Sequence, residues 1–184
     1  MSRYFQLPFV MLLTLSAMFM SCSPKYAYFT DDLQKQNRWS ESDLQRIQFY
    51  VSRDIVLYRT IQKGQSAIRE GKILMRNGKE VEQVVIKEGT PGVLLFMPKE
   101  DRFAISFDDA GDEAYLMFGP NPKYHNRYAL LAQEWERQSG KVHYKGEVYD
   151  VDTHSAFASL LVDLRRNGQV KYKSTTARGR KVGQ

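Results

Sequence analysis

The chain has 184 residues and a formal net charge of +6, with 42% hydrophobic and 26% charged residues. This length suits one globular domain with a sizeable core. A single cysteine excludes an internal disulfide, so hydrophobic packing must stabilise the fold without cross-links.

The first 21 residues have the organisation of a secretory signal peptide. Arg3 is their only charged residue, and the 14 residues from Leu7 to Met20 are almost all apolar. A helix that spans a bilayer needs about 20 apolar residues, so this run is too short for a span and fits a signal peptide. No second long apolar run follows.

Cys22 follows this segment directly and is preceded by Ser21. The pair resembles the processing site of bacterial lipoprotein precursors, in which a small residue precedes a cysteine whose thiol receives a diacylglycerol. The resemblance covers only this N-terminal segment. It implies that residues 1–21 are removed, that Cys22 is the lipid attachment site, and that the mature chain is anchored in the cell envelope. Ser23 after the cysteine implies outer-membrane sorting. The alternatives are an ordinary cleaved signal and an uncleaved anchor helix.

Residues 22–29 are expected to be a tether, and two short helices are expected after it. Thr30 precedes two acids and predicts a helix over 31–36, because a hydroxyl caps the first turn and acids favour it. Ser40 and Asp43 have the spacing of a capping box, which predicts a second helix over 41–48.

From residue 49 onward the apolar positions alternate with a period of two, which predicts strands. Asn77-Gly78 and Asn167-Gly168 are typical of two-residue hairpin turns. Residues 127–135 also fit a helix, but their neighbours favour a strand. The expected strands cover 55–60, 72–76, 79–86, 93–97, 103–107, 114–118, 127–135, 141–144, 147–151, 158–166 and 169–174. The strand at 103–107 is expected to be buried on one face only.

These short strands and turns predict a mainly β domain over residues 30–174, followed by a basic tail over 175–184. The expected architecture is an antiparallel sandwich or barrel of about ten short strands, with one or two short N-terminal helices.

No established catalytic motif is present, so we expect neither an enzyme nor a cofactor. The strongest candidate for a metal-binding or catalytic site is the set Asp150, Asp152 and His154. In an extended strand these side chains would share one face at steps of about 6–7 Å, and carboxylates with an imidazole are ligands for divalent metals. The ordinary interpretation is a solvated strand end with Tyr149 and Val151 facing inward.

The segment GPNPKYHN, residues 119–126, is the most irregular part of the chain, with two prolines and a glycine. Such a stretch predicts an exposed functional loop. Tyr124, His125 and Tyr128 lie in or beside it and are candidate partner-binding residues, because exposed rings often stack on a partner.

The positive charge is concentrated near the C-terminus. Residues 165–184 carry +7 and no acid, whereas residues 22–164 carry −2. The cations are Arg165, Arg166, Lys171, Lys173, Arg178, Arg180 and Lys181. They are candidate contacts for anionic lipid headgroups or glycan. The ordinary interpretation is a solvated terminus, and a protein contact is a further alternative. Aromatic residues are too few there to stack nucleic-acid bases, so no nucleic acid is expected as a partner.

The sequence therefore indicates a lipid-anchored protein of the bacterial cell envelope with a binding or assembly role. An accessory subunit of an envelope complex is the type of protein expected, and its partner would be another envelope protein. The alternatives are a hydrolase or metal-dependent enzyme that uses Asp150, Asp152 and His154, and a binder of anionic envelope polymer.

Overall fold

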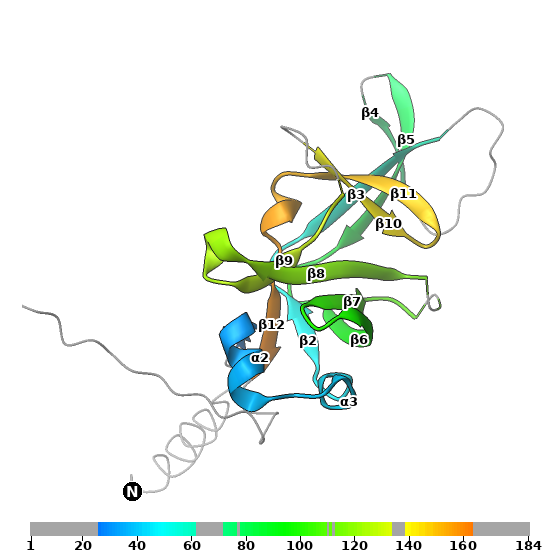
Figure 1. Ribbon diagram of the computed structural model, residues 1–184. Helices are drawn as coiled ribbons and strands as arrows, with labels where there is room; N and C mark the ends of the chain where they lie inside the picture. Colours follow the sequence, from blue (N-terminus) through cyan, green and yellow to red (C-terminus); the bar gives the residue numbers. More distant parts are fainter. Residues whose placement is uncertain are drawn as a thin grey trace, which may run out of the picture.

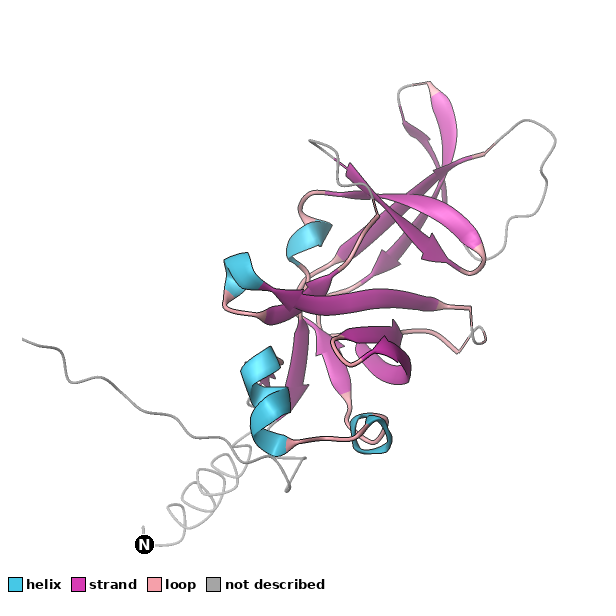
Figure 2. Cartoon of the chain, in the orientation of Figure 1, coloured by secondary structure: helices cyan, strands magenta, loops and turns pink. Residues whose placement is uncertain are grey.

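The computed structural model describes residues 26–61, 72–76, 78–109, 111, 113–133 and 139–163. Twelve antiparallel strands in this part of the chain form two sheets in a sandwich-like arrangement, and the helices are all short (Figures 1 and 2). The expected mainly β fold with short N-terminal helices is confirmed, and of the two expected architectures the sandwich is found. No helix among the described residues is long and apolar enough to cross a bilayer.

The large sheet has the strand order β1-β12-β2-β6-β7-β8-β9, and the small sheet has the order β10-β11-β3-β5-β4. The large sheet consists of β1 (Tyr26–Tyr28), β2 (Phe49–Val51), β6 (Pro91–Lys99), β7 (Arg102–Ser106), β8 (Tyr115–Asn121), β9 (Arg127–Leu130) and β12 (Leu160–Asp163). The small sheet consists of β3 (Ile55–Thr60), β4 (Lys72–Arg76), β5 (Lys79–Ile86), β10 (Ser139–Tyr144) and β11 (Glu147–Asp152). The helices are α2 (Asp31–Asn37), α3 (Glu41–Leu44) and the single 3-10 turns η2 (Pro122–Tyr124) and η3 (Ser155–Phe157).

Both expected helix starts are confirmed by their caps. The Thr30 hydroxyl accepts a hydrogen bond from the Leu33 backbone N–H at 3.1 Å. Ser40 and Asp43 each accept from the other's backbone N–H, which completes a capping box. The extension of the second helix to residue 48 was wrong. At Arg46 and Ile47 each backbone N–H donates to the carbonyl three residues earlier instead of four, so the α-helix ends before the chain enters β2 at Phe49.

Two hairpins of the small sheet follow local turn chemistry. In the β4–β5 hairpin Arg76 pairs with Lys79, and Gly78 has a φ of +74°. In the β10–β11 hairpin the turn residues Lys145 and Gly146 have φ values of 52° and 76°. Positive φ at both central residues matches the twist of the flanking strands, which is why such turns favour glycine.

One hydrophobic core extends across both sheets, and aromatic rings fill its centre beneath the helices. Phe29 lies among three other rings, with centroids 5.4 Å from Phe49, 5.5 Å from Phe103 and 5.0 Å from Tyr128. All four side chains are fully buried. Trp39 stacks on Phe29 at 5.9 Å and so fixes the connection between α2 and α3 to the core.

β7 is buried on both faces, which corrects the expectation of one buried face. Ala104 and Ser106, on the outer face, are as inaccessible as their core-facing neighbours. Their cross-strand partners are large: Ala104 lies between Phe96 and Met117, and Tyr115 is opposite Ser106. Because the rings of Phe96 and Tyr115 also contact each other at 5.1 Å, they cover the small residues between them.

The tether expected over residues 22–29 was wrong for its last part, because residues 26–28 form β1. This edge strand pairs with β12, and Tyr26 lies opposite Asp163. The strand expected over 127–135 ends at Leu130. Cys22, the Asn167-Gly168 hairpin, the strand over 169–174 and the cations from Arg165 to Lys181 lie outside the described residues.

Candidate functional site

The irregular segment 119–126 is a tight connection and not a long loop. β8 continues through Asn121, whose side-chain oxygen accepts from the Lys123 N–H at 3.0 Å and so caps η2. His125 and Asn126 then take left-handed conformations, with φ values of 54° and 53°, and β9 begins. Only the tip around Tyr124 and His125 is exposed to solvent.

Tyr128 belongs to the core and not to this exposed tip. Its side chain is fully buried, and its ring centroid lies 4.5 Å from that of Phe103. Because Tyr128 is part of β9, strand alternation points its ring inward. The expected contact of a partner with Tyr128 is therefore corrected, whereas Tyr124 is 37% exposed.

Tyr124 instead forms an exposed aromatic patch with Phe157 and Arg53. The rings of Tyr124 and Phe157 meet edge to face with centroids 5.2 Å apart. The Arg53 guanidinium lies 5.6 Å from the Phe157 ring centroid. Both rings remain 37% exposed. Three separate segments thus place two rings and a cation on one surface, which we call the aromatic patch.

Hydrogen bonds on both sides of Arg53 hold it beside η3. The Ser52 N–H donates to the Ser159 carbonyl, and the Ser159 N–H donates to the Ser52 hydroxyl, both at 2.9 Å. On the other side, the Val56 N–H donates to the Ser155 hydroxyl at 3.0 Å. Since these bonds hold residues 52–56 against 155–159, the patch has a rigid support.

Asp150, Asp152 and His154 do not assemble as metal ligands. Asp150 is exposed on β11 while Tyr149 and Val151 are buried, so the ordinary interpretation of this strand is the one found. β11 ends at Asp152, whose carboxylate accepts from the Ser155 N–H at 2.9 Å. The chain then turns, so the extended spacing does not reach His154. No group of three His, Cys, Asp or Glu side chains suited to a metal occurs in the described part of the chain.

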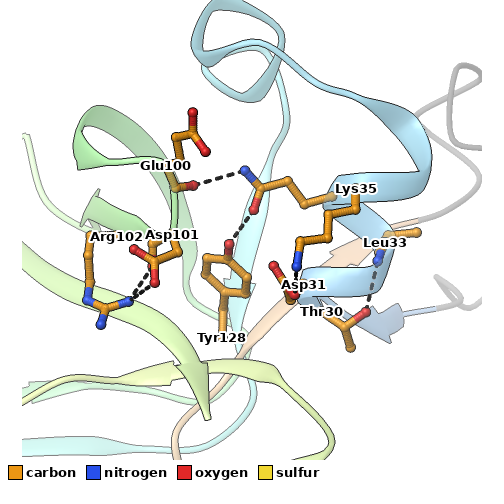
Figure 3. Close-up of polar contacts among 9 residues, drawn as sticks. Thr30, Asp31, Leu33, Lys35, Glu100, Asp101, Arg102 and Tyr128 are labelled. Atoms are coloured by element: carbon orange, nitrogen blue, oxygen red, sulfur yellow. Dashed lines mark hydrogen bonds and ion pairs between the residues drawn. The ribbon is translucent and has the colours of Figure 1, made fainter. Parts of the chain in front are cut away.

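A cleft of about 1050 Å³ lies between α2 and the β6–β7 turn. At its wall Gln34 links three elements: its amide donates to the Glu100 carbonyl at 3.0 Å, and its side-chain oxygen accepts from the Tyr128 hydroxyl (Figure 3). Burial, and next the nearby Asp31 charge, raise the pKa of Tyr128 far above its usual value. The tyrosine therefore stays protonated and acts as a donor.

Three further polar contacts lie at or beside the cleft. Lys35 binds Asp31 at 2.6 Å, and the Arg102 guanidinium binds the Asp101 carboxylate at 2.6 Å (Figure 3). Glu41 of α3 accepts from the Met97 N–H at 3.0 Å, in a part of β6 where a bulge shifts the strand register. These contacts attach the helices to the sheet, and we assign them a structural role.

A second polar cluster lies on the inner face of the small sheet. Arg59 donates to one oxygen of Glu82 through Nε at 3.0 Å and through Nη2 at 2.7 Å, and its Nη1 lies 3.1 Å from Glu147. The hydrogen bonds to Glu82 raise the pKa of Arg59. Burial, and then the Glu82 charge, raise the pKa of Tyr149, whose ring centroid lies 5.6 Å from the guanidinium. Arg59 therefore stays protonated and positively charged, and Tyr149 stays protonated and neutral.

Sequence reasoning identified Tyr124 and missed Phe157 and Arg53. Phe157 lies directly before the strand expected over 158–166, and no pattern assigned it a role. Arg53 lies in a turn far away in the sequence. A usable signal was the Asp152–Ser155 spacing, which is typical of a side-chain cap and so of a turn before Phe157.

Comparison with known proteins gives no relative on which a role could be based: no protein family, curated protein or solved structure matches this chain.

Proposed function

We propose that this chain is a lipid-anchored protein of the bacterial cell envelope, held by an acylated Cys22, that binds another envelope protein. The aromatic patch of Tyr124, Phe157 and Arg53 is the contact surface. Its partner presents apolar side chains to the two rings and a carboxylate to the guanidinium.

The anchor is supported by the lipoprotein-like Ser21-Cys22 pair and by its distance from the fold. Cys22 precedes Tyr26, the first residue of β1, by four residues. An extended chain spans at most about 3.6 Å per residue, so at most about 14 Å can separate the acylated residue from the sheet. A domain held this closely stays beside the bilayer surface.

The exposed aromatic patch is the observation that carries the binding role. Tyrosine and arginine are enriched among the residues that dominate protein interfaces, and an aromatic ring offers a large contact area with few rotatable bonds. The patch sits on turns that are bonded to both sheets, so little ordering is needed when a partner binds.

The anchor predicts a defined change in mass. Protein purified from cell membranes should weigh more than the polypeptide from Cys22 onward by the mass of its acyl groups. Cys22→Ser should abolish this added mass, because serine offers no thiol for acylation. The matched control is Ser23→Ala, which should keep it. Intact-mass spectrometry makes the comparison, and native protein without acyl mass would refute the anchor.

The binding role predicts a partner contact that depends on the patch. A photo-crosslinking residue at position 124, in intact cells, should capture one protein reproducibly. Phe157→Ala should reduce that capture about tenfold, the effect of losing one interface residue worth more than 1 kcal/mol.

A crosslinker at position 96 provides the matched control, because Phe96 is similarly exposed, at 38%, on a different surface. It should not capture the same protein. Equal capture from both positions, or capture that Phe157→Ala leaves unchanged, would contradict the assignment of the patch as the contact surface.

A further inference from the structure

The cleft between α2 and the β6–β7 turn has two walls that come from distant parts of the chain. One wall is the end of α2 and the connection to α3, with Arg38 and Trp39, and the other is the hairpin tip, with Lys99 and Glu100. The hydrogen bond from the Gln34 amide to the Glu100 carbonyl joins the two walls at 3.0 Å (Figure 3). We call this site the α2 cleft. It shares no residue with the aromatic patch.

The α2 cleft contains charged side chains that the fold does not use. Arg38, Lys99 and Glu100 are exposed, and none of the three side chains has an ion-pair partner among the described residues. The other charged groups of the lining are engaged within the fold, as Lys35 is with Asp31 at 2.6 Å. Two cations and one acid therefore line the cleft without a partner, which favours a ligand that carries a negative charge.

Arg38 has a backbone conformation that a smaller residue would adopt more easily. It ends α2 with a φ of 51°, in the left-handed region, and its N–H donates to the Gln34 carbonyl at 2.9 Å. Glycine or asparagine is usual at such a helix end, because other side chains are strained there. An arginine in a strained conformation beside a cleft indicates that its side chain has a use other than stability.

Trp39 supplies an aromatic surface next to this cation. Its indole stacks on the Phe29 ring, with centroids 5.9 Å apart and an angle of 19° between the two planes. Because Phe29 belongs to the core, this stacking fixes the orientation of the indole, and the accessible part of Trp39 lines the cleft. A fixed aromatic ring surrounded by polar groups suits a sugar, whose C–H groups pack on the ring while its hydroxyls form hydrogen bonds.

We propose that the α2 cleft binds an acidic sugar, whose ring packs against Trp39 and whose carboxylate binds Arg38 and Lys99. Of the twelve described residues that line the cleft, nine are polar. A ligand with hydroxyls on every side leaves few of these groups without a hydrogen bond, whereas an apolar ligand would leave many. Small-molecule sites have volumes of about 300–1,000 Å³, so the cleft of about 1050 Å³ accommodates a disaccharide.

Two matched disaccharides test the proposal. One is N-acetylglucosamine linked to N-acetylmuramic acid, and the other is two linked N-acetylglucosamines. The pair differs only in the lactyl group that carries the carboxylate. The purified chain, in a detergent without sugar groups, should bind the acidic disaccharide about tenfold or more tightly, the effect of one hydrogen bond to a charged group. A glycine–glutamate–glycine peptide with blocked ends has the carboxylate without the sugar and should bind about tenfold or more weakly than the acidic disaccharide.

The fluorescence of Trp39 locates the binding. The chain has two tryptophans, and Trp135→Phe, a change outside the described residues, leaves Trp39 as the one that remains. Its emission should change as the acidic disaccharide binds, because the sugar replaces water beside the indole. Binding detected by calorimetry without this change would place the ligand elsewhere and would overturn the proposal.

Arg38→Gly separates binding from stability. This variant should weaken binding of the acidic disaccharide about tenfold, the effect of losing one hydrogen bond to a charged group. It should keep or raise the midpoint of thermal unfolding, because glycine adopts the left-handed conformation without strain. Lys99→Gln should also weaken binding. Lys123→Gln is its matched control, because Lys123 is exposed but lies outside the cleft, and it should change binding less than twofold.

Four further outcomes overturn the proposal. They are equal affinity for the two disaccharides, no binding of the acidic disaccharide at millimolar concentration, unchanged binding by Arg38→Gly, and a peptide that binds as tightly as the acidic disaccharide. The last would make the cleft a site for acidic peptides. None of these results depends on acylation of Cys22 or on capture from position 124, so the α2 cleft is tested separately from the anchor and the aromatic patch.

Discussion

Arg59→Met is expected to lower the free energy of unfolding by about 3–5 kcal/mol, the usual cost of removing one partner from a buried ion pair. The Glu82 side chain is only 4% exposed, and it would lose both hydrogen bonds that Arg59 donates. Its carboxylate would then remain buried without this cation. Urea-induced unfolding with an unchanged slope measures the loss.

Arg46→Met is the matched control for this variant. Arg46 also pairs with a carboxylate, that of Asp43 at 2.6 Å, but its side chain is 73% exposed. Exposed ion pairs contribute about 0–1 kcal/mol, so a small change is expected. The double variant Arg59→Met with Glu82→Met should recover much of the loss, because it removes both charges. Equal losses for Arg59→Met and Arg46→Met would contradict a buried pair.

Phe103→Ala is expected to cost about 3–5 kcal/mol, because it removes a large side chain from a tightly packed core and leaves a cavity. Phe103 is fully buried and contacts the rings of Phe29, Phe49 and Tyr128, at centroid distances of 5.5, 6.1 and 4.5 Å. The loss should appear as a lower midpoint in thermal and urea unfolding.

Phe96→Ala removes the same side chain from a different setting. Phe96 is 38% exposed and contacts one ring, that of Tyr115. Its loss should cost about 1 kcal/mol, the contribution of one exposed aromatic pair. If the two alanine variants were equally stable, the ring cluster beneath the helices would not be the centre of the core.

Features encoded within a few neighbouring residues were predictable from the sequence. Thr30 caps α2 through a residue three positions away, and the β4–β5 and β10–β11 hairpins depend on the two residues in each turn. The period of two located most strands, because it reflects which face of a strand is buried. These signals do not depend on knowing where distant segments lie.

Features that join distant segments were not predictable in this way. The strand period is compatible with many pairings, so nothing local indicates that β1 pairs with β12, or that a turn near Arg53 lies beside Phe157. The Asp150–His154 stretch shows a related ambiguity. An aspartate at the end of a strand can continue the alternation of the strand or cap the turn that follows. Asp152 caps the turn, because its carboxylate accepts a hydrogen bond from the Ser155 N–H. The metal-ligand set of Asp150, Asp152 and His154 assumed that the strand continues to His154, and the strand ends at Asp152.

The pairing of β1 with β12 also determines when the domain can be completed. A chain emerges N-terminus first, so β1 is made long before β12, its neighbour in the large sheet among the described strands. Until then Tyr26 and Tyr28 lie on an unpaired strand, and unpaired strands are prone to aggregation and slow to find distant partners. A chain that stops before Leu160 would leave this first strand without its partner β12.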